Sequence, residues 1–390
     1  MEKVIGSKKV PIKIWANDVD EGTEEQLMNL SELPFVFKHI ALMPDGHKGY
    51  GMPIGGVMCT KNVVVPNAVG VDIGCGMCFV ESDLDVVEKD VLKKIMGRVR
   101  EVIPVGFKHH KEDQDVRLPR MDSMMNYDGY SVLNPLVSSA KKQLGTLGGG
   151  NHFVELQKNE DGKMCVMIHS GSRNVGFKVA KHFNDLAKEL NEKWCSSVPK
   201  KHELAFLPLD SDEGRAYMDC MNYCVEFALL SRKLMIDRVQ DAIREFCPDV
   251  KFGEVINVAH NYAKMENHFG KNVMVHRKGA TRAYEGEIGI IPGSQGTSSY
   301  IVKGRGNVDS FKSCSHGAGR KMGRKQAQRT LDFDEEVKKL DDLGVIHSIR
   351  NKKDLDEAAG SYKDIDVVMD NQSDLVEIVS KLTPLAVIKG

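Results

Sequence analysis

The 390-residue sequence lacks an excess of either charge, a long apolar run and regular cysteine spacing. Lysine and arginine number 54 against 55 acidic residues, which excludes the strongly basic surface that drives non-specific binding to duplex nucleic acid. No stretch approaches the ~18 apolar residues of a membrane span, and the first residues show no signal-peptide pattern. We therefore expect a cytoplasmic protein without membrane contact, which grips any nucleic acid through a few local phosphates.

The nine cysteines do not have the spacing of a disulfide framework, and an odd number would leave one unpaired in a secreted protein. A reducing compartment is therefore expected. Cys75 and Cys78 form one Cys-x-x-Cys pair, but no second pair follows to indicate a zinc ribbon, so we expect Cys78 in the core. The chain also lacks internal repeats, heptads, a Walker A loop and a dinucleotide-binding fingerprint, and a monomer is the default expectation.

Runs rich in β-branched residues predict strands, and apolar residues at spacings of three and four predict helices. The predicted strands cover 35–43, 54–65, 164–168, 254–259 and 272–275, and the predicted helices cover 85–102, 177–193 and 214–246. Because these elements do not alternate regularly, the pattern favours an α+β fold with mixed sheets and packed helices, in one compact domain over residues 1–390. The polar stretch 108–134 is a candidate variable insertion.

Asp72 and Cys75 stand three positions apart in a frame that contains Gly70, Gly74 and Gly76. A buried structural cysteine beside an exposed aspartate is a common arrangement, but three glycines within seven residues favour a tight binding turn. A thiolate with carboxylate and imidazole ligands suits Mn²⁺, Zn²⁺ or Co²⁺ better than Mg²⁺ or Ca²⁺. The frame is thus a candidate fragment of a metal site, in which a thiolate can bridge two ions.

Four of the thirteen histidines have glycine, serine or asparagine neighbours: His152, His169, His260 and His316. Any one of them is as compatible with a satisfied core position as with a ligand, but the set favours convergence at strand ends, where sites are usually built. Six others lie in polar or helical surroundings and are predicted to have surface or capping roles. They are His109, His110, His182, His202, His268 and His347.

Glycine-rich loops adjoin these histidines, at 144–151, 169–173, 291–299 and 315–320. Such loops expose backbone N–H groups to phosphate oxygens, and Arg173 and Arg320 can add forked donors. Each loop alone is weak evidence for phosphate binding, since glycine-serine loops usually only connect secondary-structure elements. Four of them beside candidate ligands favour a substrate that carries phosphates.

In ordered motifs from Pro11 to Gly390, the sequence resembles the RtcB family of GTP-dependent RNA-splicing ligases, as a compact member of bacterial type. The motifs are Met43-Pro44-Asp45-Gly46-His47, Gly70-Val71-Asp72-Ile73-Gly74-Cys75-Gly76, Gly150-Asn151-His152-Phe153-Val154-Glu155, His169-Ser170-Gly171-Ser172-Arg173, His260-Asn261, Pro292-Gly293-Ser294, Ser315-His316-Gly317-Ala318-Gly319-Arg320 and Lys389-Gly390.

The resemblance implies a ligase that joins an RNA 3′-phosphate or 2′,3′-cyclic phosphate end to a 5′-hydroxyl end with GTP and two Mn²⁺, in RNA repair or tRNA splicing. Cys75 would bridge the metals, with Asp72 and His152 on one ion and His169 and His260 on the other. His316 would carry GMP covalently and pass it to the RNA as a 3′-diphosphoguanosine end.

The resemblance also assigns nucleotide and RNA contacts, and it admits an accessory activator of the archease type. The guanylate pocket would comprise Asn151, Phe153, Glu155, Asn261, Pro292, Gly293, Ser294, Gln295, Ser299, Gly317, Ala318, Gly319 and Lys389. The RNA contacts would be Asp45, Arg173, Lys278 and Arg320. Departures from common family residues are Asn174, Gln295 and Gly323.

Two other functions fit the same metal donors. A dimetal phosphodiesterase or phosphatase would not need His316 or Lys389, and neither would a non-catalytic sensor of RNA ends. Covalent labelling by GTP discriminates the ligase from both.

Overall fold

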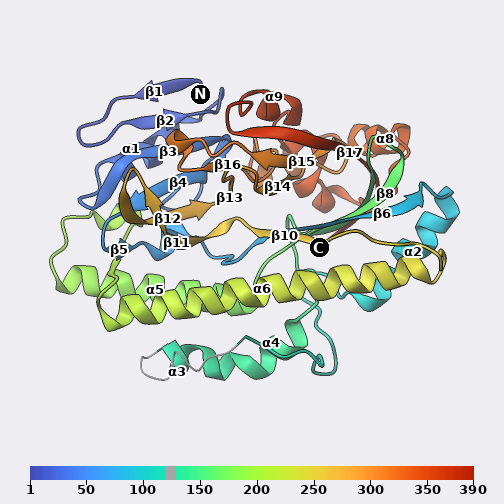
Figure 1. Cartoon of the computed structure of the whole chain (residues 1–390), viewed down its shortest axis with the longest axis horizontal. Helices are drawn as coiled ribbons and strands as arrows, with labels where there is room; N and C mark the ends of the chain where they lie inside the picture. The colour runs from blue at the N-terminus through green and yellow to red at the C-terminus, as the bar shows by residue number, and fades with distance from the viewer. Residues whose placement is uncertain (120–128) are drawn as a thin grey trace.

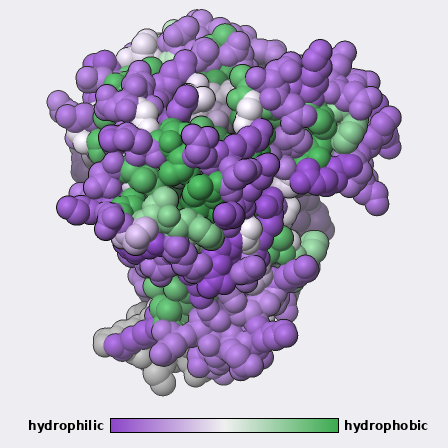
Figure 2. Space-filling model, turned by 90° about the vertical axis from the view of Figure 1, so that its right-hand side faces the viewer, coloured by the Kyte–Doolittle hydropathy of each residue, from purple (hydrophilic) through white to green (hydrophobic). Residues whose placement is uncertain are grey.

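The computed structural model describes residues 1–119 and 129–390, which form a mixed α/β domain (Figure 1). The expected fold class is confirmed. No described helix is long and apolar enough to span a membrane. Polar residues cover most of the face in Figure 2, with smaller hydrophobic patches between them.

The first of two large sheets has six strands, in the order β1-β2-β3-β4-β12-β11. Only β2 and β3 pair in parallel, whereas the other neighbours are antiparallel. The bounds are β1 Lys3–Ile5, β2 Ile12–Ile14, β3 Val36–His47, β4 Ile54–Thr60, β11 Asn261–His268 and β12 Lys271–Lys278.

The second sheet has seven antiparallel strands, in the order β10-β6-β8-β7-β17-β15-β14. Its bounds are β6 Gly76–Asp85, β7 Phe153–Lys158, β8 Lys163–Ser170, β10 Ile256–Ala259, β14 Ile288–Ile291, β15 Ser299–Gly304 and β17 Val376–Lys389. Two small pairs, β13 Ala280–Arg282 with β16 Ser313–Ser315 and β5 Val63–Val64 with β9 Leu207–Pro208, complete the strands.

The long helix α6, Asp212–Arg244, runs beneath both large sheets, with α5 beside it (Figure 1). Its N-terminus is capped by Ser211, and its apolar face packs on β6, β8, β10 and β11. The other helices are α1 Glu21–Ser31, α2 Lys89–Val102, α3 Gly129–Leu133, α4 Val137–Gln143, α5 Arg173–Lys193, α7 Arg324–Thr330, α8 Phe333–Asp342 and α9 Ile365–Asp370.

The five predicted strands coincide with β3, β4 followed by β5, β8, β10 and β12, and the three predicted helices with α2, α5 and α6. Helix α2 begins at Lys89, because Asp85 still belongs to β6. Strand β17 escaped the sequence pattern because exposed residues alternate irregularly with buried ones at its start. Part of the candidate insertion, residues 120–128, lies outside the described residues.

Candidate metal centre and nucleotide pocket

A cavity of about 1060 Å³ contains most of the candidate site residues. Its walls come from the 70–75 loop, the start of β7, the end of β8, the 292–299 loop, the 316–326 segment and the end of β17. All the predicted nucleotide contacts line it, as do Asp72, Cys75, His169, His260, His316, Lys278 and Arg320. Asp45, His152 and Arg173 are not among the residues that line it.

Five predicted metal ligands converge in two groups that share Cys75. One group is Asp72, Cys75 and His152, the other is Cys75, His169 and His260, and within each group the ligand atoms lie within 4.8 Å of one another. Cys75 Sγ lies 3.5 Å from His152 Nε2 and 3.2 Å from His169 Nε2. This is the arrangement that the sequence predicts for a shared thiolate.

Backbone carbonyls orient two of the imidazoles. His152 Nδ1 lies 3.0 Å from Leu147 O, and His169 Nδ1 lies 3.1 Å from Asn151 O, so each ring turns Nε2 toward Cys75. Metal-ligating histidines commonly donate their other N–H in this way. His260 Nδ1 is buried without a hydrogen-bond partner among the described residues, as expected of a donor atom that a cation would satisfy. The donor set therefore fits divalent metal ions.

Glycine permits the close approach of the backbone at this centre. Gly74 has φ +72°, and a Cβ there would lie 2.8 Å from Val225 Cα in α6. A Cβ on Gly171 would lie 2.1 Å from Asp72 Oδ1. Larger residues at either position would displace the loop or the carboxylate.

The protonation states of the donor side chains also fit a cation site. Burial, followed by the charge of Asp72, raises the pKa of the Cys75 thiol well above 9.0. Burial and neighbouring histidines hold the pKa values of His169 and His260 well below 6.5, so both imidazoles are neutral, as ligation requires. A thiolate here therefore needs a bound cation to offset its burial.

His316 is held by Asp45, a contact between residues 271 positions apart. Asp45 Oδ2 accepts from the His316 backbone N–H at 3.1 Å and lies 2.5 Å from His316 Nδ1. Burial alone would raise the pKa of Asp45, but His316 brings it below 3.8, so the carboxylate is ionised. The expectation that Asp45 contacts RNA does not fit this fully buried position. It orients His316 and leaves Nε2 available.

The predicted guanylate residues line the cavity and make several contacts with one another and with its walls. Pairing of β7 with β17 places Lys389 opposite Phe153, with Lys389 Nζ 5.2 Å from the ring centroid. Ser299 Oγ accepts from Gly293 N at 3.1 Å and from Gln157 Nε2 at 3.0 Å. Asn261 is already engaged, because its amide donates to Asp72 O and accepts from Gly279 N.

Glu155 gives a stability prediction. Burial raises its pKa from 4.5 to about 8. Between these values the unfolded chain ionises while the folded carboxyl keeps its proton, so the free energy of unfolding falls as pH rises from 4.5 to about 8. Glu155→Gln should remove this loss and be more stable than wild type at pH 9 by roughly 3 to 5 kcal/mol, with little difference at pH 4. Urea unfolding of both proteins without ligands checks this. The same pH dependence in both would contradict it.

The three predicted RNA-contacting cations occupy different environments. Arg173 donates to Thr146 Oγ1 and Gly106 O from behind the cavity wall. Lys278 Nζ donates to Tyr50 O at 2.6 Å and to Asn67 O at 3.1 Å, and burial lowers its pKa to about 7. Arg320 lines the cavity but donates to Met322 O and Asp356 O.

The sequence analysis did not predict the role of Arg232 at the site. This fully buried residue of α6 donates to Gly74 O at 2.8 Å and to Ser170 O at 2.7 Å, and so supports the loops that carry the predicted metal ligands. The sequence feature that could have indicated this role is a charged residue on the largely apolar buried face of α6.

Cys78 is buried in the core as predicted. The prediction that His268 has a surface or capping role is wrong, because this histidine is buried against Glu266, which also pairs with Arg277.

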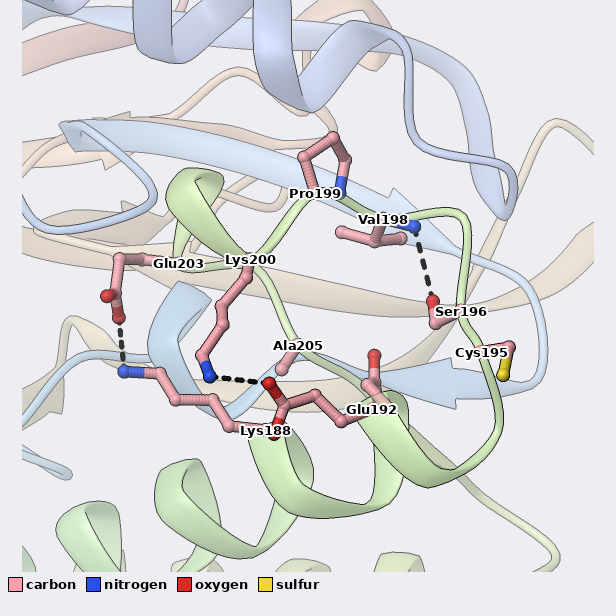
Figure 3. A pocket seen from close by; sticks show the side chains of 10 residues that line it. Lys188, Glu192, Cys195, Ser196, Val198, Pro199, Lys200, Glu203 and Ala205 are labelled. Atoms are coloured by element: carbon pink, nitrogen blue, oxygen red, sulfur yellow. Dashed lines mark hydrogen bonds and ion pairs between the residues drawn. The ribbon is translucent and has the colours of Figure 1, made fainter.

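A second cavity, of about 290 Å³, lies at the end of α5 (Figure 3). Its charged side chains pair with each other, Lys200 with Glu192 and Lys188 with Glu203. Cys195 is exposed there, with no neighbouring set of ligands among the described residues. The chemistry therefore concentrates in the larger cavity.

Comparison with known proteins agrees with this geometry. The family model described as "tRNA-splicing ligase RtcB" matches residues 26–390. The chain belongs to the RtcB family. It is 35% identical to the RNA-splicing ligase RtcB of Escherichia coli (strain K12), over 100% of this chain and 99% of that protein. The tRNA-splicing ligases RtcB of Nanoarchaeum equitans and Thermococcus kodakarensis are 32% and 31% identical, over 99% and 98% of this chain and 96% and 95% of theirs.

The match confirms the predicted family and enzyme class. RtcB proteins are RNA ligases that act in RNA repair and tRNA splicing and depend on GTP and manganese. Membership in the RtcB family therefore implies that this chain uses metal and GTP and takes RNA ends as substrates.

Proposed function

We propose that this RtcB ligase joins RNA 3′-phosphate or 2′,3′-cyclic phosphate ends to 5′-hydroxyl ends through GMP carried on His316. The observation that carries the proposal is the position of His316 in one cavity with four of the five predicted metal donors, Asp72, Cys75, His169 and His260. The His316 and His260 ring centroids are 4.7 Å apart. A nucleophile and metal donors at this spacing can act on one phosphate.

Asp45 prepares His316 for attack. With the Nδ1 proton held by the Asp45 carboxylate, Nε2 presents its lone pair to phosphorus. In the first step Nε2 bonds to the α-phosphorus of GTP, and the bond from that phosphorus to the bridging oxygen breaks to release pyrophosphate. A 2′,3′-cyclic end is first opened by water, which breaks the bond from phosphorus to the 2′-oxygen and leaves a 3′-phosphate. In the second step an oxygen of the RNA 3′-phosphate bonds to the phosphorus of GMP as the bond to His316 Nε2 breaks. In the third step the RNA 5′-hydroxyl attacks the 3′-phosphorus and displaces GMP.

Asp72, Cys75 and His152 would hold one Mn²⁺, and Cys75, His169 and His260 the other. Bound there, the ions neutralise charge on phosphate oxygens and lower the barrier to attack. Arg173 lies behind the first group, where its charge acts on Asp72 and Cys75. We therefore assign it to the electrostatics of the metal centre, and Lys278 and Arg320 to the RNA phosphates.

Guanosine would be read at the end of the cavity that contains Glu155, Lys389 and Phe153. Gln295, a departure from common family residues, is buried there with Oε1 unpaired among the described residues. An unpaired acceptor suits the hydrogen-bond donors of a nucleotide. We further propose a monomer that acts in the cytoplasm, where its nine free thiols remain reduced, with an archease-type activator as a potential partner.

Incubation with radiolabelled GTP and Mn²⁺, followed by denaturing electrophoresis, tests the proposed function. Covalent label on the protein is the expected result. Labelled ATP should give at least ~100-fold less, because adenine would leave buried polar groups of the pocket unpaired. Equal labelling by both nucleotides would contradict the guanosine assignment, with Gln295 the first residue to examine. Absence of label from both would favour a phosphodiesterase or an RNA-end sensor.

A further inference from the structure

The carboxylate of Glu357 lies directly behind the nucleotide pocket. It ends the 3₁₀ helix Lys352–Glu357 and is 3% exposed. Glu357 is absent from the cavity lining, but its side-chain partners all line the cavity. They are Arg320, Arg324, Tyr362 and Lys389. Any effect of Glu357 on a bound nucleotide therefore passes through these four side chains.

Both oxygens of Glu357 are engaged. Oε1 accepts from Arg320 Nη1 at 3.2 Å and from Arg324 Nε at 2.9 Å. Oε2 accepts from the Tyr362 hydroxyl and lies 3.9 Å from Lys389 Nζ. Hydrogen bonds to an ionised carboxylate are stronger than neutral ones, and they fix the direction of each donor.

The same residue also orients Gln295. Its backbone carbonyl accepts from Gln295 Nε2 at 2.8 Å, which leaves Gln295 Oε1 buried and without a partner among the described residues. The side chain and backbone of Glu357 thus act on different walls of one pocket.

The partners of Glu357 contact two functional parts of the site. Lys389 Nζ lies over the Phe153 ring, and its charge also acts on Glu155. A Cβ on Gly150 would lie 2.6 Å from Arg324 Nη2, so this guanidinium rests against the loop that leads to His152. Through these side chains, one carboxylate is connected to both the predicted base-reading residues and the loop before a predicted metal ligand.

Electrostatics explains why an anion is needed here. Three cations would repel one another in a partly buried wall, and without a common partner each would turn toward solvent. Burial alone would raise the pKa of Glu357, but Lys389 and Arg320 bring it below 4.5, so the residue is an anion at neutral pH.

We propose that Glu357 is a positioning residue of the nucleotide pocket, which holds Arg324, Tyr362 and Lys389 in the directions that bind GTP and keeps Arg320 beside them for the RNA phosphate. This inference rests on the proposed function and adds a residue to it. Glu357 touches neither the reacting atoms nor the metal donors, so its effect should fall on nucleotide binding rather than on the chemical step.

The test measures covalent labelling as a function of GTP concentration in wild type and Glu357→Gln, at saturating Mn²⁺. Glutamine keeps the shape of the glutamate side chain but removes its negative charge. It also places an amide N–H₂ group against side chains that are themselves hydrogen-bond donors. The KM for GTP should rise on the order of tenfold or more, while the labelling rate at saturating GTP should change less than about threefold. Glu357→Asp, which keeps the charge, should give a KM between the two.

Glu336→Gln is the matched control. Glu336 is also buried, at 3% exposed, but its partners are Lys339 Nζ and the backbone N–H of Gly360, and neither residue lines the cavity. The melting temperature of Glu336→Gln shows how much stability is lost when a buried carboxylate in this region is neutralised. Its KM for GTP should equal that of wild type.

An unchanged KM in Glu357→Gln would overturn the inference, and so would an equal rise in Glu336→Gln. If Glu357→Gln does not fold, Glu357→Asp provides the test. Its side chain is one methylene shorter, so the carboxylate lies farther from its partners and the KM for GTP must still rise. Failure of the wild type to label at all would instead refute the proposed function, so the two failures are distinguishable.

Discussion

Cys75→Ser should lose both metal ions, whereas His152→Ala and His260→Ala should each lose about one. The reason is the position of Cys75 in both donor groups, while each histidine belongs to only one. Serine cannot replace the thiolate, because its hydroxyl stays protonated and is a much weaker ligand. RNA joining by Cys75→Ser should fall at least ~1000-fold, because phosphoryl transfer would lose its metals.

Elemental analysis after dialysis against Mn²⁺ checks this prediction. Cys78→Ser is the matched control, since Cys78 is equally buried, lies three residues away and belongs to neither donor group. It should retain both ions. Equal metal content in Cys75→Ser and His260→Ala would argue against a shared thiolate.

His316→Ala should lose covalent labelling by GTP and should not join ordinary 3′-phosphate ends. The imidazole supplies the nitrogen that we propose carries GMP, and alanine has no nucleophile. The variant Asp45→Asn tests the proposed role of the carboxylate, because it keeps His316 but removes the charge that holds the Nδ1 proton. It should label on the order of 100-fold more slowly rather than not at all. Persistent labelling of His316→Ala would place GMP elsewhere.

The sequence contained enough to predict which candidate metal donors the structure brings together. Local features mark Cys75, which lies in a glycine frame, and His169, which follows a predicted strand, but the set of five comes from the family resemblance. Periodicity also located the long helix α6, since its apolar face persists over 33 residues. His152 lies at a strand end as predicted, directly before β7.

The contacts behind the site could not be predicted, because the residues that make them are distant in the sequence. Asp45 meets His316 only after β3 and the 316–320 loop have packed together, and no local pattern in either segment specifies that contact. Glu357 lies in a polar stretch that reads as surface, yet it is buried by the cations around it. Buried ion pairs such as Glu266 with Arg277 are invisible for the same reason.

The division of labour between His316 and the metal centre can be tested most directly with RNA that already bears a 3′-diphosphoguanosine end. This substrate needs no nucleophile from the protein, but it still needs the metals to stabilise the departing GMP. Well-folded His316→Ala should seal this RNA to a 5′-hydroxyl end, whereas Cys75→Ala should not. Sealing by Cys75→Ala, or failure of His316→Ala to seal, would contradict this division of labour.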